Sequence, residues 1–243
     1  MISKAKVRFI KSLQVKKYRL AEQCFIVQGA KAVQETLDSE FQVLMLYGTE
    51  TFLQGVKSAR RAKEVAEVSE KELTALGSVE VNQAALAVVR MKPRREPELL
   101  KDRFTLVLDD IRDPGNLGTI IRTADWYGVR TILASPETTD VYGPKVINAT
   151  MGSFLRVDIH YTNLEPILAR KLYPVFGTFL DGENVHQADF GKQGLIVIGN
   201  ESRGISPGVE KWVTRRMTIP RIGRAESLNA SVATAIVLDN IFR

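Results

Sequence analysis

The chain has 243 residues, and its 34 Lys and Arg residues outnumber its 28 Asp and Glu residues, which gives a formal net charge of +6. Its 44% hydrophobic and 26% charged residues are typical of a folded chain, so the composition excludes an intrinsically disordered protein. The longest stretch without a charged residue covers residues 227–238, well short of the roughly 18 apolar residues that a membrane helix needs, so we expect no contact with a membrane.

The cysteine and histidine residues indicate neither a disulfide nor a metal site. Cys24 is the only cysteine and lies in the apolar run 24–27, which predicts a buried thiol without a chemical role in a reducing compartment, the cytoplasm. His160 and His186 are far apart in the sequence and lack the spacing of zinc ligands. We therefore expect no bound metal.

The first twenty residues are strongly basic. They hold seven Lys and Arg residues and no Asp or Glu, a pattern shared with organelle transit peptides. The apolar residues Val7, Ile10, Leu13 and Leu20 follow helical spacing and lead directly into a strand-like run. A basic first helix of a folded domain is the interpretation that this spacing favours.

Residues 1–90 alternate short apolar runs with helical stretches, which predicts a small α/β sandwich. The expected strands cover residues 24–28, 43–47, 65–68 and 86–90. The segment 91–98 that follows has two prolines, dense charge and one apolar residue. It predicts a linker over residues 91–102 between two domains.

The positive charge belongs mainly to the first part of the chain. Residues 1–102 hold 18 basic and 13 acidic residues, a net of +5, whereas residues 103–243 hold 16 and 15, a net of +1. Any one basic group could be an ordinary solvated surface, but three groups together favour an anionic polymer such as RNA as partner. The groups are residues 4–19, residues 57–63, and Arg90, Lys92, Arg94, Arg95 and Lys101.

Residues 103–243 repeat the alternation of strands and helices on a larger scale. Strand-like runs occur at residues 104–108, 131–134, 175–179 and 195–198. Such alternation predicts a mostly parallel sheet covered by helices on both faces. Open sheets of this kind bind ligands at the carboxyl ends of their strands, and three segments place polar and glycine residues there.

The first of these segments covers residues 108–124. A strand ends in a Pro-Gly turn, and a helix begins near Asn116 with Arg122 about two turns inside it. Free backbone N–H groups at such a helix start attract phosphate, and an arginine adds a planar fork for the same group. The alternative is a capping asparagine and a surface arginine. The spacing matches neither a Walker loop nor the G-x-G-x-x-G fingerprint, which argues against a nucleotide-binding hydrolase.

The second segment, residues 195–205, is a fully apolar strand followed by Glu201 between two glycines. This pattern predicts a carboxylate on a tight turn at the edge of the sheet, unless Glu201 is an ordinary loop acid. In the third segment, residues 219–235, Ser227 is expected to cap an apolar C-terminal helix. Asn229 and Ser231 add polarity to its start, and we expect a bound ligand to supply their partners.

Together the three segments resemble the three sequence motifs of the SpoU (TrmH) family of RNA 2′-O-methyltransferases, in the SPOUT superfamily. The motifs are D-P-G-N-L-G-T-I-I-R-T-A, I-G-N-E-S-R-G-I and I-P-R-I-G-R-A-E-S-L-N-A-S-V-A-T-A. Residues 16–19 and 25–31 also resemble the N-terminal substrate-binding domain of the family, a fold similar to ribosomal proteins. Gln28 replaces the usual glutamate of relatives, and Asn148 replaces an arginine expected to face RNA.

The resemblance implies a parallel sheet whose C-terminal part forms a trefoil knot over residues 103–243. It implies that S-adenosylmethionine is held by backbone near Thr178, Gly199, Ile219 and Leu228. It also implies a homodimer formed through the C-terminal helix, which fits the apolar face of Val232, Ala235, Ile236 and Ile241.

The resemblance further implies that Arg122 is central to methylation of a ribose 2′-hydroxyl. The arginine would hold an RNA phosphate and polarise the hydroxyl, with the phosphate as a candidate proton acceptor. It would be supported by other polar residues of the motifs, namely Asn116, Glu201, Ser227 and Asn229. The basic first domain favours ribosomal RNA over transfer RNA as substrate. The alternative is a non-catalytic RNA-binding module with a degenerate methyltransferase domain.

Overall fold

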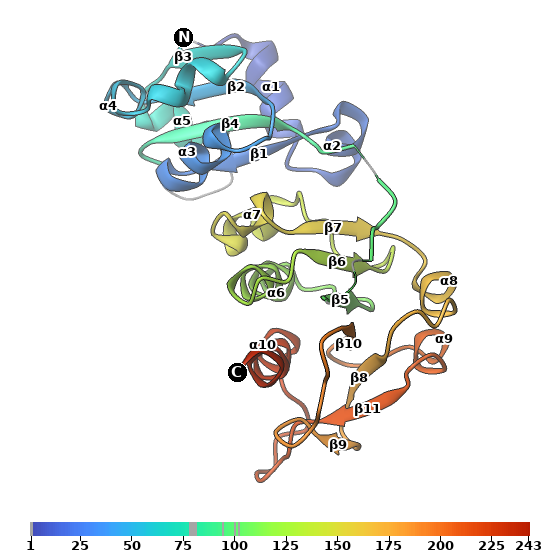
Figure 1. Ribbon diagram of the computed structural model, residues 1–243. Coiled ribbons are helices and arrows are strands. Elements are labelled where there is room, and N and C mark those ends of the chain that lie inside the picture. Colours follow the sequence, from blue (N-terminus) through green and yellow to red (C-terminus); the bar gives the residue numbers. More distant parts are fainter. Residues whose placement is uncertain (1, 78–81, 94, 100, 102) are drawn as a thin grey trace. The chain divides into compact units, whose positions relative to one another are not determined.

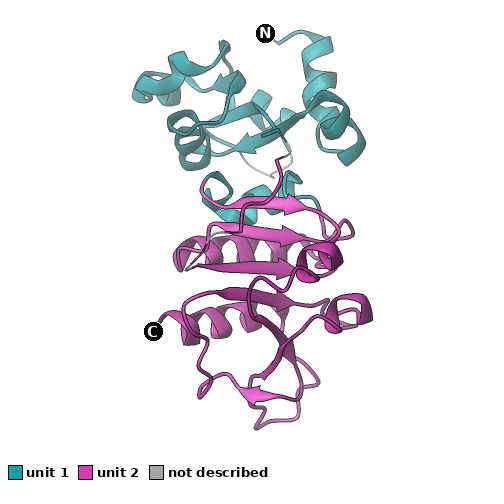
Figure 2. Cartoon of the chain, turned by 45° about the vertical axis from the view of Figure 1, so that its right-hand side comes forward, with its two compact units in different colours: residues 1–93, 140–155 teal, residues 94–139, 156–243 magenta. Residues whose placement is uncertain are grey.

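The computed structural model describes residues 2–77, 82–93, 95–99, 101 and 103–243 (Figure 1). The chain forms two compact units, which Figure 2 shows in different colours. Unit 1 consists of residues 1–93 and 140–155, and unit 2 of residues 94–139 and 156–243. The described residues of the expected linker, 91–102, lie in no helix or strand, while Arg94 lies outside the described residues.

Unit 1 is built on a mixed sheet with the strand order β1-β4-β2-β3 in its described part. Strand β4 runs antiparallel to both of its neighbours, and β2 runs parallel to β3. The strands are β1 Cys24–Gln28, β2 Val43–Gly48, β3 Glu64–Glu67 and β4 Ala85–Arg90. The helices before residue 93 are α1 Lys4–Ser12, α2 Lys16–Glu22, α3 Ala30–Asp38, α4 Glu50–Gly55, the 3-10 turn η1 Lys57–Arg61 and α5 Glu70–Leu76.

Strands β1 and β4 of unit 1 carry buried residues on both faces. Alternate residues of β1 point to opposite sides, so Phe25 packs with α3 residues such as Val33, while Ile26 packs with Ile10 of α1 and Leu73 of α5. Cys24 lies in the second of these clusters and is buried, as the apolar run predicted. The sheet is therefore the middle layer of three.

The expected single basic helix is in fact two. Helix α1 ends at Ser12, and a short connection precedes α2, which begins at Lys16. The break turns the chain, so Leu13 is buried while Leu20 of α2 is 41% exposed. The helical spacing in the sequence extends the apolar face of the first helix to Leu20. Because the helix is broken, Leu20 does not lie on that face.

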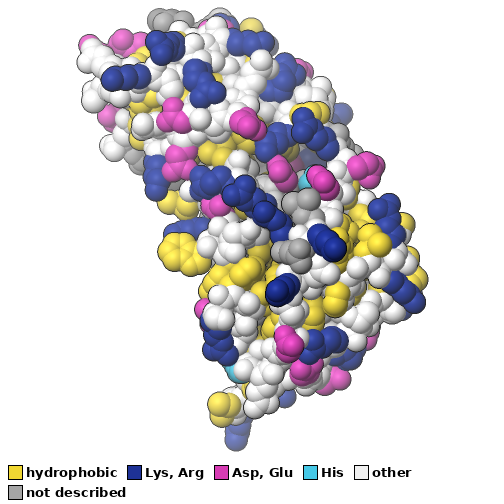
Figure 3. Space-filling model, in the orientation of Figure 1, with side chains coloured by type: hydrophobic (Ala, Val, Ile, Leu, Met, Phe, Trp, Pro, Cys, Tyr) yellow, Lys and Arg dark blue, Asp and Glu magenta, His cyan; other side chains and the backbone are white. Residues whose placement is uncertain are grey.

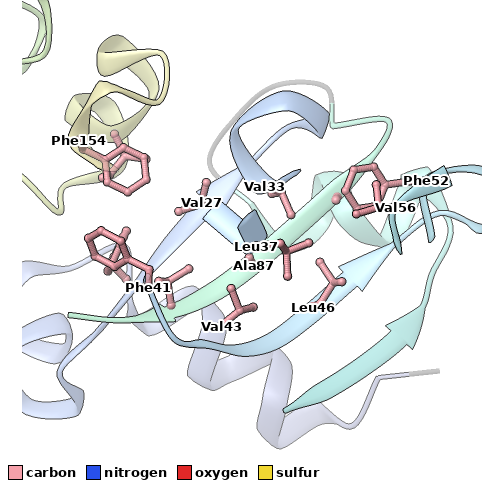
Figure 4. Packing of buried hydrophobic residues seen from close by; sticks show 14 of the residues in the cluster. Val27, Val33, Leu37, Phe41, Val43, Leu46, Phe52, Val56, Ala87 and Phe154 are labelled. Atoms are coloured by element: carbon pink, nitrogen blue, oxygen red, sulfur yellow. The ribbon is translucent and has the colours of Figure 1, made fainter. Parts of the chain in front are cut away.

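Unit 1 also takes part of its core from a distant segment of the chain. Residues 140–155 include α7 Pro144–Thr150 and the 3-10 turn η2 Ser153–Leu155. Ile147 and Phe154 from this segment join the cluster around Phe25 and Phe41, and Figure 4 shows the Phe154 ring beside Phe41. The ring centroids of Phe154 and Phe41 are 5.8 Å apart in an edge-to-face arrangement, a favoured geometry for aromatic pairs.

A buried ion pair fastens the same segment to α2. The guanidinium of Arg19 donates from Nε and Nη2 to Asp140 Oδ2 at 3.0 and 2.7 Å. Its Nη1 donates to the carbonyl oxygens of Leu13 and Gln14 at 2.9 and 2.8 Å. The side chains of Arg19 and Asp140 are only 5% and 11% exposed, so each charge depends on the other for its stabilisation.

Unit 2 contains a fully parallel sheet of seven strands in its described part, with the order β7-β6-β5-β10-β8-β11-β9. The parallel pairing and the four strongest strands agree with the sequence prediction. The strands are β5 Phe104–Leu108, β6 Thr131–Ala134, β7 Asp158–Tyr161, β8 Val175–Phe179, β9 Glu183–Asn184, β10 Gly194–Ile198 and β11 Arg215–Thr218.

Helices cover both faces of this sheet. On one face, α8 Leu164–Leu168 and α9 Pro207–Glu210 pack against alternate residues of the central strands, among them Val107 and Val197. The other helices, α6 Pro114–Trp126 and α10 Ala230–Phe242, pack against each other, and α10 contacts β10 (Figure 1). Within the described residues, no helix is both long and apolar enough to cross a membrane.

Candidate active site

The candidate site lies at the carboxyl ends of β5 and β10 in unit 2. These strands are neighbours, and the chain leaves them in different directions, from β5 into α6 and from β10 into the turn before α9. The carboxyl edge between two such strands is where open parallel sheets place their ligands. The first two sequence motifs meet at this edge because β5 and β10 pair in register from Phe104 to Leu108.

Three of the expected catalytic residues form one hydrogen-bonded chain. Asn116 Nδ2 donates to Glu201 Oε1 at 2.6 Å, and Asn229 Nδ2 donates to Asn116 Oδ1 at 2.7 Å. One amide therefore links all three motifs, which lie up to 113 residues apart in the sequence.

Asn116 is held by the start of α6. Asp113 caps this helix and accepts from the backbone N–H of Asn116 at 2.8 Å, and Pro114 occupies the first helical position. The helix therefore begins two residues earlier than expected, and Asn116 is not its cap. Its side chain remains available for the contacts with Glu201 and Asn229.

Glu201 lies on a tight turn, as the glycines around it predicted. Asn200 and Gly204 exchange backbone hydrogen bonds of 3.0 and 2.9 Å, and Gly204 has a φ of +70°. A Cβ atom at Gly199 would lie 2.3 Å from the carbonyl carbon of Gly204, so only glycine allows the turn to close.

The start of α10 corrects two expectations from the sequence. The capping residue is Asn229, whose Oδ1 accepts from the N–H groups of Ser231 and Val232 at 2.9 and 3.3 Å. Ser227 is exposed and lies before the cap, because the helix starts at Ala230 rather than directly after Ser227. The polar groups of Asn229 and Ser231 are paired within the chain, so they need no ligand to satisfy them.

Arg122 stands apart from this hydrogen-bonded chain. It lies in the third turn of α6, it is exposed, and it makes no hydrogen bond or ion pair with any residue that the structure describes. A guanidinium in this state keeps its planar fork available for an external phosphate or carboxylate.

Sequence reasoning missed a group of residues that tie the loops after β5 and β10 together. The buried Asp109 accepts from the N–H of Ser206 at 2.7 Å, and Asn200 Nδ2 donates to the carbonyl of Asp110 at 2.8 Å. Asp110 has a φ of +61°, a left-handed conformation that aspartate tolerates better than most residues. The sequence feature that could have revealed this group is the pair of adjacent acids, Asp109 and Asp110, directly after an apolar strand.

The residues expected to bind the cofactor share the same edge of the sheet. Thr178 is in β8 and donates to the carbonyl of Val197 at 3.2 Å, and Gly199 follows β10. Ile219 follows β11, and Leu228 directly precedes the cap of α10. Because β10 and β11 flank β8 in parallel, the backbones at Thr178, Gly199 and Ile219 lie at one carboxyl edge.

The groups available at this edge suit an adenosyl and amino-acid ligand better than a metal. They are mainly backbone amides and carbonyls of loops outside any helix or strand, together with the Thr178 hydroxyl. Among the described residues there is no group of His, Cys, Asp and Glu arranged to hold a metal ion. The residues present therefore fit S-adenosylmethionine.

Two family models match the chain. The model of the SpoU rRNA methylase family matches residues 103–239, and a model described as an MRM3-like substrate binding domain matches residues 4–87. The first match spans more than half of the chain. The chain belongs to the SpoU rRNA methylase family.

Individual relatives are similar over almost the full length. The chain is 30% identical to the 23S rRNA (guanosine(2553)-2′-O)-methyltransferase RlmP of Bacillus subtilis, over 96% of this chain and 94% of the relative. A solved structure of a putative TrmH-family RNA methyltransferase from Porphyromonas gingivalis matches with a TM-score of 0.89 and 38% identity, over 99% of this chain and 98% of that one. An AdoMet-bound rRNA methyltransferase from Sinorhizobium meliloti matches with a TM-score of 0.89 and 30% identity, over 99% and 95%.

These findings confirm the family that the three motifs indicated. They also confirm the expected enzyme class, an RNA 2′-O-methyltransferase, and S-adenosylmethionine as its cofactor. The parallel sheet agrees with the predicted fold class.

Proposed function

We propose that this chain transfers a methyl group from S-adenosylmethionine to a ribose 2′-hydroxyl of ribosomal RNA. The observation that carries the proposal is the hydrogen-bonded chain of Asn116, Glu201 and Asn229, which joins all three motifs at the carboxyl edge of the sheet. The names of similar proteins support ribosomal over transfer RNA, since RlmP acts on 23S rRNA. We also propose that the C-terminal part of the sheet is knotted, as in the SPOUT superfamily.

The cofactor would be held at the carboxyl ends of β8, β10 and β11 by the backbone near Thr178, Gly199, Ile219 and Leu228. When bound, it supplies an electrophilic methyl group on a sulfonium sulfur. The chain then has to place a ribose hydroxyl in line with that methyl group and assist the loss of the hydroxyl proton.

Arg122 would carry the RNA side of this task. A guanidinium stays protonated in proteins, so it acts as a donor rather than a base. Its fork would hold the phosphate next to the target ribose and polarise the 2′-hydroxyl, while a phosphate oxygen accepts the proton. Glu201 would orient the substrate through Asn116, and Asn229 would fix the Asn116 amide. We assign Ser227 a contact with the substrate, because its exposed hydroxyl has no partner among the described residues.

We further propose that the enzyme is a homodimer formed through α10. Val232 is 46% exposed and Phe242 is 45% exposed, while Ala235, Ile236 and Ile241 are half-buried. Sedimentation equilibrium should give twice the mass of the 27.1 kDa chain, and Val232→Glu should shift the equilibrium toward one chain. A wild-type protein that sediments as one chain would contradict this proposal.

The test of the activity uses purified protein, radiolabelled S-adenosylmethionine and unmodified transcripts of large-subunit ribosomal RNA and of transfer RNAs. We expect label in the ribosomal transcript alone, and mass spectrometry should map it to a ribose. A deletion strain should lack the same methyl group. Cofactor binding without transfer to any RNA would favour the non-catalytic RNA-binding module instead.

A further inference from the structure

The cations at the start of the chain divide into two groups in the structure. Residues 2–21 contain seven Lys and Arg residues and no Asp or Glu. Two of the seven are used inside unit 1, because Lys6 pairs with Glu64 and Arg19 is buried against Asp140. The other five are exposed and have no hydrogen bond or ion pair with any described residue, namely Lys4, Arg8, Lys11, Lys16 and Lys17.

Three of the five exposed cations share one face of α1. Lys4, Arg8 and Lys11 follow the i, i+4, i+7 spacing that lines up side chains on a helix. The opposite face carries Ile10, which is fully buried, and leads to the buried Leu13. Helix α1 is thus held to the sheet by its apolar face and presents a row of like charges to solvent, which an anion nearby would stabilise.

Helix α2 adds two more exposed cations and an aromatic ring. Lys16 and Lys17 lie in its first turn, and Tyr18 beside them is 47% exposed. The neighbouring Arg19 is buried and fixed, so the backbone that carries Tyr18 is anchored. Figure 3 shows Lys and Arg side chains over the part of unit 1 that contains these helices.

We infer that RNA binds unit 1 on the α1–α2 surface, defined by the five exposed cations and Tyr18. The cations contact phosphates, and the Tyr18 ring stacks on an unpaired base. Single strands and loops of structured RNA offer both groups, whereas a continuous duplex hides its bases. The inference rests on the proposed function in that it takes RNA as the substrate.

An anionic membrane fits the same surface less well. A helix that lies on a membrane buries a continuous apolar face in the lipid. In α1 that face, with Ile10, is already packed against the sheet of unit 1. The exposed apolar side chains are the separate residues Val15 and Leu20, which form no such face.

The first experiment measures the affinity of the protein for unmodified large-subunit ribosomal RNA by fluorescence anisotropy between about 50 and 200 mM salt. The triple variant K4Q/R8Q/K11Q should bind roughly tenfold more weakly or worse. The slope of log Kd against log salt should fall by about 2 to 3, since each lost phosphate contact removes about 0.7 to 0.9. A triple variant with the wild-type slope would overturn the inference.

The matched control removes the same charge from unit 2. Arg170, Lys171 and Lys192 are exposed and make no side-chain ion pair with described residues. The variant R170Q/K171Q/K192Q should keep the wild-type slope. An equal loss in both triple variants would mean that net charge alone attracts the RNA, and the α1–α2 surface would not be the binding site.

The second experiment tests the ring. Tyr18→Ala should weaken binding by roughly tenfold or more at all salt concentrations without changing the slope, because stacking involves no phosphate. Tyr18→Phe should restore the affinity, since it keeps the ring. Urea unfolding followed by circular dichroism should give the wild-type transition for every variant, which shows that unit 1 remains folded.

The outcomes separate this inference from the proposed function. If the wild type binds the transcript through the α1–α2 surface but transfers no methyl group, the proposed function fails and the inference stands. If it methylates the transcript while K4Q/R8Q/K11Q binds normally, the inference fails alone. Binding of the wild type to phosphatidylserine vesicles, lost in the triple variant and unmatched by any RNA binding, would assign the surface to a membrane.

Discussion

The α1–α2 surface of unit 1 and the carboxyl edge of the unit 2 sheet use polar side chains in opposite ways. On the α1–α2 surface five cations have no partner among the described residues, whereas at the edge Asn116, Glu201 and Asn229 are joined to one another. Attraction of a polyanion requires only charge, because phosphates are recognised with little regard to sequence. Methyl transfer requires fixed distances and angles, so its residues are held before the substrate arrives.

Arg122 is an exception to this difference, since it belongs to unit 2 and also has no partner among the described residues. Arg122→Ala should lower the rate of methyl transfer by about 10²- to 10⁴-fold, because a group that assists proton loss in the transition state would be missing. Calorimetry should find S-adenosylmethionine binding unchanged. Arg170→Ala, which removes another exposed arginine of unit 2, is the control and should have normal turnover. Near-normal turnover of Arg122→Ala would remove it from the mechanism.

Arg19 is the opposite exception in unit 1, because its guanidinium is fully hydrogen-bonded while the five exposed cations near it in sequence have no partner among the described residues. Arg19→Ala should lower the free energy of unfolding of unit 1 by about 3–5 kcal/mol, because Asp140 would remain as a buried charge without its partner. Urea unfolding followed by circular dichroism measures this. Lys6→Ala removes a half-exposed ion pair with Glu64 and should cost less than about 1 kcal/mol. Equal losses of unfolding free energy in Arg19→Ala and Lys6→Ala would show that burial does not increase the contribution of the Arg19–Asp140 pair to stability.

The effects of substituting Asn116 and Asn229 on turnover should not be independent, because both residues belong to one hydrogen-bonded network with Glu201. Asn116→Ala and Asn229→Ala should each lower turnover by about tenfold to 100-fold, because each removes support for Glu201. The double variant should lose little more than either single variant, which a double-mutant cycle measures. Multiplicative losses would mean that the two asparagines act independently.

The smallest expected effect concerns the reactivity of the Cys24 thiol, which depends on whether unit 1 stays closed around it. Burial raises the pKa of its thiol, so less thiolate is present near pH 8 than in a free cysteine, and the thiolate is the reactive form. Its reaction with a thiol reagent should be at least about tenfold slower in the folded protein than in denaturant. Arg19→Ala should accelerate the reaction, because α2 ends just before Cys24 and loses its anchor. If Arg19→Ala reacted with the thiol reagent at the wild-type rate, loss of the Arg19 contacts would not expose Cys24.

The sequence predicted the strands whose residues are apolar on both sides. Strands β5 and β10 are buried at every position, and their continuous apolar runs were visible without a structure. Strand β11 was missed because it begins with Arg215 and Arg216, whose charges are paired with acids on neighbouring segments. Strand β7 was missed because its residues Asp158–Tyr161 are half-buried or exposed, which leaves no apolar run.

The sequence predicted three residues that the structure brings together, but it did not predict their geometry. The three motifs named Asn116, Glu201 and Asn229, but their contacts depend on the pairing of β5 with β10, which joins segments about ninety residues apart. Serine is a good capping residue, which predicts a cap at Ser227, but Asn229 is equally good and lies directly at the helix start. Nothing local distinguishes these two residues.

The contribution of residues 140–155 to unit 1 has a consequence for synthesis of the protein. A nascent chain that has reached Pro93 contains the sheet of unit 1 but lacks Ile147 and Phe154, which belong to the hydrophobic cluster around Phe25 and Phe41. The ribosome must add 62 further residues, from 93 to 155, before this cluster can close, roughly 3–12 s at ordinary rates of translation. During that interval Phe25 and Phe41 lack the ring of Phe154, which packs edge-to-face against both in the finished protein.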